Sequence, residues 1–170
     1  MASLEIAINL LWESDVPRSD RLPSEDRIRE AVLAAAAFRA CDVGEIGVAI
    51  VDDAQIHRLN RQHLQHDYPT DVVSFPYGLA PPHVEGELVV SWDTALREAD
   101  RIGWAADREL LLYVVHGTLH LVGMDDQQTS DRAAMRLAEC AVLEQLGILD
   151  VQTFGPDRTD PPSDEVSLSR

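Results

Sequence analysis

The stretch DRELLLYVVHGTLHLV, residues 107–122, decides the fold of this chain. After a polar first turn, apolar residues surround the helix that this stretch predicts, instead of lining one side of it. A helix that is apolar all round needs cover on every side. We therefore predict a buried central helix with the other elements of the domain packed around it.

The segments around this helix predict a small sheet. Four stretches have the alternation or the β-branched composition of strands, and they are residues 4–10, 45–51, 72–75 and 85–91. Helical patterns separate and follow them, at residues 25–39, from residue 53 onward, and at 93–102 and 131–146. This order predicts an α+β fold, or a loosely α/β one, in which a mixed four-stranded sheet packs against a helical layer.

Two of the predicted helices carry capping signals at their first turn. Ser24 precedes the acidic start of the first helix and is placed to cap it. Asp52 and Gln55 form a capping box for the second helix, which would carry Ile56, Leu59 and His63 on one side. These signals fix where both helices are expected to begin.

Length and composition predict one domain. The chain has 170 residues, of which 45% are apolar and 26% charged, and this suits a single domain over residues 1–149. Residues 150–170 hold three prolines and little apolar content, so we expect a disordered tail. No apolar run could span a bilayer and the N-terminus lacks a basic leader, so we expect a cytoplasmic protein. We expect Cys41 and Cys140 to be reduced and buried.

The charge balance limits how the protein could bind nucleic acid. Its net charge is −16, and all 14 basic residues are arginines. An acidic protein repels phosphate groups, so an RNA-binding role would need a local basic patch or a metal ion. The absence of lysine excludes P-loop and Schiff-base chemistry.

Two histidines and an aspartate at the end of the central helix predict a metal site. His116 and His120 are four residues apart and therefore face the same side of the helix. Two buried imidazoles on one face more often share a metal ion than lack partners. Gly123 can adopt the left-handed conformation that ends a helix, which would bring Asp126 back as a third ligand.

The alternative is structural, with two core histidines and an aspartate that caps the next helix. Because the helix is buried and the turn is in place, we favour the metal. Two nitrogens and one oxygen with an open fourth position are typical of catalytic zinc, which lowers the pKa of bound water to about 7. Gly117 stands where H-E-x-x-H proteases carry their glutamate base, and the cysteine motif of zinc deaminases is absent from the sequence.

Two segments resemble the signatures of a known family. HGTLHLVGMDD, residues 116–126, resembles H-G-x-L-H-L-x-G-x-D-H of the YbeY family of bacterial metal-dependent endoribonucleases. LNRQHLQHDYPTDVVSFP, residues 59–76, is similar to the second family signature, L-N-x-x-Y-R-x-x-D-x-P-T-[DN]-V-[LV]-S-F-P. EGELVVS, residues 85–91, is similar to a family strand of the G-D-I/L type, and the resemblance covers residues 4–147.

The resemblance implies a small α+β fold with one zinc ion per chain, held by His116, His120 and Asp126. It implies cleavage of single-stranded RNA in the maturation of the 3′ end of 16S ribosomal RNA and in ribosome quality control. The implied partners are ribosomal RNA and the small ribosomal subunit.

Two departures from the family pattern matter for the chemistry of the site. Asp126 replaces the last histidine of the first signature, which keeps a competent ligand but adds negative charge to the metal site. Leu64 replaces an arginine that could stabilise negative charge on a phosphate. We name Arg61, one helical turn earlier, as the candidate catalytic residue that could replace it, with His63 as a second choice.

Two other functions remain open. A ribosome-associated factor could keep the metal site and bind its partner without cutting RNA, as the acidic charge and Leu64 would favour. A zinc hydrolase of another substrate is also compatible with the ligand set, which favours an enzyme of some kind.

Overall fold

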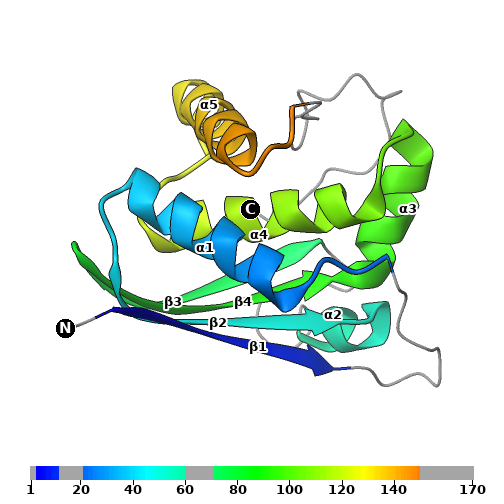
Figure 1. Cartoon of the computed structure of the whole chain (residues 1–170), viewed down its shortest axis with the longest axis horizontal. Helices are drawn as coiled ribbons and strands as arrows, with labels where there is room; N and C mark the ends of the chain where they lie inside the picture. The colour runs from blue at the N-terminus through cyan, green and yellow to red at the C-terminus, as the bar shows by residue number, and fades with distance from the viewer. Residues whose placement is uncertain (1–2, 12–20, 60–70, 150–170) are drawn as a thin grey trace.

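The computed structural model describes residues 3–11, 21–59 and 71–149, which form four strands and five helices (Figure 1). The strands are β1 (Leu4–Leu11), β2 (Val43–Val51), β3 (Val72–Ala80) and β4 (His83–Ser91). The helices are α1 (Glu25–Phe38), α2 (Asp53–Leu59), α3 (Trp92–Ile102), α4 (Ala106–Leu121) and α5 (Thr129–Gln145). The predicted α+β fold is confirmed.

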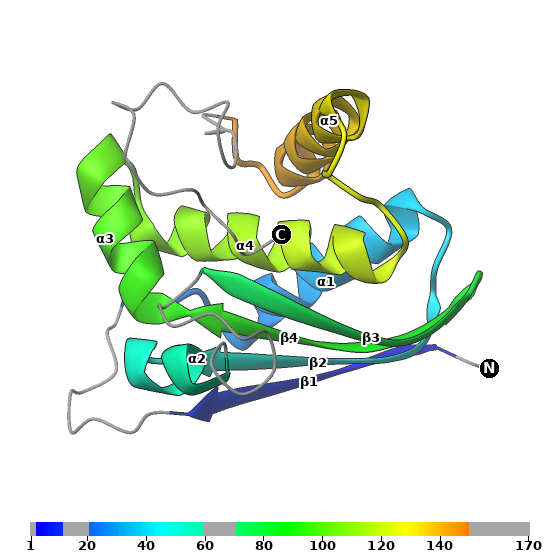
Figure 2. The same cartoon turned by 180° about the vertical axis from the view of Figure 1, so that it is seen from behind.

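The four strands form one mixed sheet in the order β1-β2-β4-β3. The strands β1, β2 and β4 run parallel to one another, and β3 pairs antiparallel with β4 at the edge. The parallel pairs need long crossover connections, and these contain α1 and α2. Helix α1 crosses the face of the sheet that α4 also covers (Figures 1 and 2).

Strand β3 is longer than the sequence pattern predicts. The sequence predicts a strand over residues 72–75, but β3 continues through Pro76 to Ala80. Its register shifts between Pro76 and Gly78. A proline is tolerated here because β3 is an edge strand, where one backbone N–H is not needed for pairing. The sequence pattern therefore predicts a shorter hairpin of β3 and β4 than the structure has.

Helix α4 is the centre of the molecule, as predicted. It contacts α1, α3 and α5 and also lies on β3 and β4 (Figure 2). Nearly every residue of the helix is buried, including the polar side chains of Glu109, His116 and Thr118. The main hydrophobic core surrounds it on all sides.

Two glycines allow α4 to approach the sheet closely. A Cβ atom on Gly117 of α4 would lie 2.8 Å from Leu88 Cδ2 and 3.0 Å from Val72 Cγ2. A Cβ atom on Gly86 of β4 would lie 2.6 Å from the side chain of Leu121. All three distances are shorter than van der Waals contact, so a larger residue at either position would push the helix and the sheet apart.

Helix α2 packs in a second, smaller core with Val51, Val73 and Val89. Val73 of β3 and Val89 of β4 alternate along their strands with Val72, Leu88 and Val90, which belong to the main core. Side chains alternate across a strand, so α2 covers part of the face opposite α4. Its start is as predicted, with the Asp52 carboxylate accepting from Gln55 N at 3.0 Å.

Other predictions have different outcomes. Ser24 caps α1 by accepting from Arg27 N at 3.2 Å, which confirms that signal. Cys41 is buried as predicted, but Cys140 is only partly buried, because it lies at the edge of the packed side of α5. Both cysteines are free thiols. Residue 63 on the predicted second helix and the tail from residue 150 lie outside the described residues.

Candidate metal centre

Helix α4 and the turn after it bring three predicted ligands together. His116 and His120 lie one turn apart near the end of the helix. The chain then turns at Gly123, whose φ of 96° is in the left-handed region, as the sequence predicts. Asp126 follows this turn and returns to the two histidines.

The ligand atoms of the three side chains form a compact triangle. His116 Nε2 lies 3.1 Å from His120 Nε2, and Asp126 Oδ2 lies 3.5 Å from the first and 3.6 Å from the second. Three ligands in tetrahedral positions at zinc distances of 2.0–2.1 Å would be separated by about 3.3–3.4 Å. The geometry of the group therefore fits a zinc ion without rearrangement.

The two imidazoles each make a hydrogen bond at Nδ1, and these bonds orient the rings so that both Nε2 atoms point to the centre of the triangle. His120 Nδ1 lies 3.0 Å from the carbonyl oxygen of Met124, which can only accept, so Nδ1 carries the proton. His116 Nδ1 lies 2.8 Å from Oε1 of Glu139. A neutral histidine protonated at Nδ1 presents a lone pair at Nε2. Two lone pairs and a carboxylate thus converge on one point, where a cation is the natural partner.

Burial is unequal around the site. The side chains of His116 and Asp126 are 0% and 2% exposed, whereas that of His120 is 19% exposed. The group is therefore closed toward the core and open to solvent beside His120. A catalytic zinc keeps one such open position for water or substrate, whereas a structural zinc is closed on all sides.

Glu139 is a polar residue at the site that the sequence pattern missed. It lies on α5, it is 1% exposed, and it is separated from His116 by 23 residues in the chain. Glu139 reaches His116 from a different helix, so its spacing from the histidines in the sequence matches no metal-binding motif. Only the packing of α5 against α4 brings the two side chains together.

The two segments that resemble family signatures meet in the structure. Ser74 of β3 donates a hydrogen bond from Oγ to the carbonyl oxygen of Gly117, at 3.2 Å. This contact links the strand directly to the helix turn that carries His116. The two catalytic candidates of that segment, residues 61 and 63, and residue 64 lie outside the described residues. The role of Arg61 stays a prediction.

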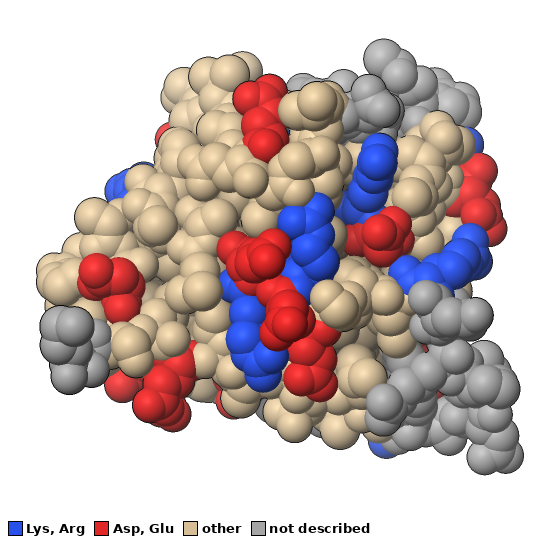
Figure 3. Space-filling view, in the orientation of Figure 1, with Lys and Arg blue, Asp and Glu red and all other residues tan. Residues whose placement is uncertain are grey.

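Several arginines on the described surface form ion pairs with acidic residues. Arg29 lies 3.6 Å from Glu25 and 3.7 Å from Asp26 on α1, and Arg101 lies 2.6 Å from Glu98 on α3. Figure 3 shows this interleaving of positive and negative side chains on one face of the molecule. On this face the described residues form no continuous basic patch that could hold a polyanion.

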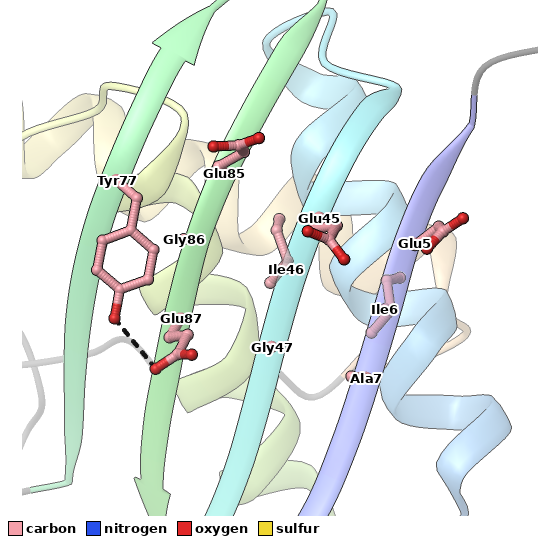
Figure 4. A pocket seen from close by; sticks show the side chains of 10 residues that line it. All are labelled: Glu5, Ile6, Ala7, Glu45, Ile46, Gly47, Tyr77, Glu85, Gly86 and Glu87. Atoms are coloured by element: carbon pink, nitrogen blue, oxygen red, sulfur yellow. Dashed lines mark hydrogen bonds between the residues drawn. The ribbon is translucent and has the colours of Figure 1, made fainter.

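A hollow of about 360 Å³ lies on the sheet face opposite α4 (Figure 4). Four glutamates from three strands surround it, and they are Glu5, Glu45, Glu85 and Glu87. The first three are neighbours in the strand register, so their carboxylates stand side by side. Tyr77 donates to Glu87 at 3.2 Å, and burial, followed by this hydrogen bond, raises the pKa of its hydroxyl. This acidic hollow contains no residue of the metal group.

No helix among residues 3–11, 21–59 and 71–149 is both long enough and apolar enough to cross a membrane.

Comparisons with known proteins point to one family. The family model described as Endoribonuclease YbeY matches residues 17–147. Curated relatives named Endoribonuclease YbeY include one from Rhodopirellula baltica, which is 51% identical over 84% of this chain and 76% of its own length. Another, from Elusimicrobium minutum, is 38% identical over 75% of this chain and 91% of its own length.

A solved structure shares the fold. The solution structure of the Thermotoga maritima protein TM1509 aligns with a TM-score of 0.59 at 25% identity, covering 83% of this chain and 88% of that one. The family model spans the three candidate ligands, the central helix and most of the sheet. The chain therefore belongs to the YbeY family.

Proposed function

We propose that this protein is a zinc-dependent endoribonuclease that cleaves single-stranded RNA. The observation that carries the proposal is the group formed by His116, His120 and Asp126, whose ligand atoms all lie within 4.8 Å of one another beside an opening to solvent. The relatives that this chain matches are named endoribonucleases. A hydrolytic metal centre and a nuclease family are consistent with each other.

The chain contributes the following to such a reaction. Zinc, when bound, supplies Lewis-acid activation of water and of a phosphodiester. His116 and His120 would hold it through Nε2, while Met124 and Glu139 keep both Nδ1 atoms occupied. Asp126 would be the third ligand, and its charge makes the site more anionic than one with three histidines. His120 is the most exposed of the three side chains, so the substrate would approach the metal beside it.

The proposed substrate is ribosomal RNA, at the 3′ end of the small-subunit molecule, and the proposed partner is the small ribosomal subunit. This part rests on the resemblance of residues 59–76 and 116–126 to the family signatures. A ribosomal substrate and partner are also consistent with a cytoplasmic location. A protein of net charge −16 binds free RNA weakly, which favours a substrate presented by a ribosomal partner.

A second candidate function is a ribosome-associated factor that binds metal but does not cut RNA. The observation in its favour is Leu64, which stands at the arginine position of the family signature. Arg61 is the residue that we propose to act in place of the missing arginine. Only a cleavage assay separates the two functions.

The deciding experiment combines metal analysis with an RNA cleavage assay on the purified chain. We expect about one zinc per chain, cleavage of a single-stranded oligoribonucleotide but not of a duplex, loss of cleavage in chelator and recovery with added zinc. His120→Ala should lose both stoichiometric zinc and cleavage. The matched control is His83→Ala, because His83 is exposed and lies on the acidic face of β4.

Two results would change the conclusion. Cleavage that persists in chelator and in His120→Ala would show that the metal group does not run the reaction. Stoichiometric zinc and binding to small ribosomal subunits, without cleavage of any RNA, would establish the non-catalytic factor instead.

A further inference from the structure

We infer that Glu139 is a positioning residue of the metal centre, acting through His116. This inference rests on the proposed function, because it assigns a task at the same site. Glu139 Oε1 lies 2.8 Å from His116 Nδ1, and the two side chains are 1% and 0% exposed. The carboxylate fixes which nitrogen of His116 carries the proton and where the ring points.

The chemistry of the contact determines the tautomer. An ionised carboxylate can only accept, so His116 must donate from Nδ1. The lone pair of the neutral ring is then at Nε2, which faces His120 and Asp126 at 3.1 and 3.5 Å. With the opposite tautomer, Nε2 would carry a proton and could not bind a metal ion. A carboxylate behind a histidine ligand also makes it a stronger base toward the metal.

Arg136 supplies the positive charge that the buried carboxylate needs. Its Nη1 lies 3.5 Å from Glu139 Oε1, one helical turn earlier on α5, and its side chain is only 8% exposed. Taking two charges out of water costs more than packing two apolar side chains of the same size. A buried ion pair beside a ligand histidine is therefore better explained by a function than by stability.

The two ligand histidines are supported differently. His120 Nδ1 donates to a backbone carbonyl that the turn at Gly123 provides whatever the side chains are. His116 depends on a side chain from another helix. Removing Glu139 should therefore release the ring of His116 while leaving that of His120 in place.

The test uses a double variant that removes both buried charges, Glu139→Leu with Arg136→Met. Replacing a buried pair with apolar residues of similar volume leaves stability nearly unchanged or raises it, so the variant is expected to fold. If the pair were only structural, zinc affinity would also be unchanged. We expect zinc affinity to fall by roughly 10- to 100-fold, measured by competition with a chromophoric chelator.

The second readout is the tautomer of His116, observed by ¹⁵N–¹H NMR on the metal-free full chain labelled at histidine. We expect His116 to be protonated at Nδ1 in the wild type and to change tautomer in the double variant, whereas His120 keeps its own. Glu139→Gln should lose less affinity, because the amide oxygen still accepts from Nδ1. Glu144→Leu, at an exposed position on the same helix, is the matched control and should change neither property.

A double variant that keeps wild-type zinc affinity and the wild-type tautomer would overturn the inference. Neither readout uses RNA. A chain that binds zinc through the Glu139-supported His116 but cuts no RNA would refute the proposed nuclease and leave this inference standing. If the double variant cuts RNA and keeps full zinc affinity, the proposed nuclease stands and this inference is refuted.

Discussion

Asp126 and Leu64 are the two residues at which this chain differs most consequentially from the signatures that it resembles. The structure bears on the first of them. Asp126 Oδ2 is nearly equidistant from the two Nε2 atoms, so the shorter side chain still reaches the position of a third ligand. An aspartate instead of a neutral histidine keeps the site competent for zinc but makes the ion a weaker Lewis acid.

Leu64→Arg should increase RNA cleavage by at least about tenfold, which corresponds to 1.4 kcal/mol of transition-state stabilisation. The reason is that a guanidinium can stabilise the charge that develops on a phosphate, and leucine cannot. The measurement is kcat/KM on a single-stranded oligoribonucleotide. Leu137→Arg, at an exposed site on α5, adds the same charge elsewhere and is the control. If both variants accelerate cleavage equally, only net charge matters; if Leu64→Arg changes nothing, Arg61 is the next residue to replace.

At the scale of elements, the position of the metal centre depends on how closely α4 lies on the sheet. Gly117 and Gly86 remove the side chains that would separate them, and Ser74 hydrogen-bonds the helix backbone beside His116. Helix α5 then covers the other side and supplies Glu139. The ligands lie on one helix and one turn, but three further elements keep them in place.

Gly86→Ala should destabilise the protein by about 1–3 kcal/mol, because its Cβ would lie 2.6 Å from Leu121 and 3.0 Å from the backbone oxygen of Phe75. Gly47→Ala is the control, on the open face of the sheet. The nearest atom to its Cβ would be Glu87 Cγ at 3.3 Å, on a flexible exposed side chain. Urea unfolding measures both variants, and equal stability of the two would mean that α4 can shift without cost.

At the scale of the whole molecule, zinc should stabilise the fold, since its ligands come from the central helix and from the turn that leads toward α5. A ligand that binds only the folded state adds about 2.7 kcal/mol at a free concentration 100 times its Kd. For a chain of this size we expect a rise in Tm of roughly 5–10 °C. Thermal unfolding with zinc and with chelator tests this, and His120→Ala should show no zinc-dependent rise.

Deletion of residues 150–170 should change the Tm by less than about 2 °C, because the segment offers little apolar surface to bury. The comparison is between the full chain and a chain ending at Leu149, both metal-free. A drop of several degrees would show that the tail packs on the domain.

The sequence alone predicts most of the fold and the three candidate ligands that the structure brings together. The all-round apolar pattern of residues 107–122 predicts the buried helix, and the spacing of His116, His120 and Asp126 across a glycine turn predicts the metal group. Both are local properties, since periodicity and helix geometry act within a few turns of one chain segment. Strand β3 is longer than the strand that the sequence predicts. A proline is compatible with a strand only at the edge of a sheet, and local sequence does not say which strand lies at the edge.

Only the tertiary structure decided what supports the ligands. Glu139, which Arg136 contacts on α5, meets His116 because α5 packs on α4, and the contact of Glu139 with His116 joins residues 23 positions apart that share no motif. The opening beside His120 and the close approach at Gly117 are likewise set by which surfaces face one another. Spacing within one helix and the turn after it encodes the candidate ligands, whereas packing between helices encodes the orientation of His116 and the access of solvent to the group.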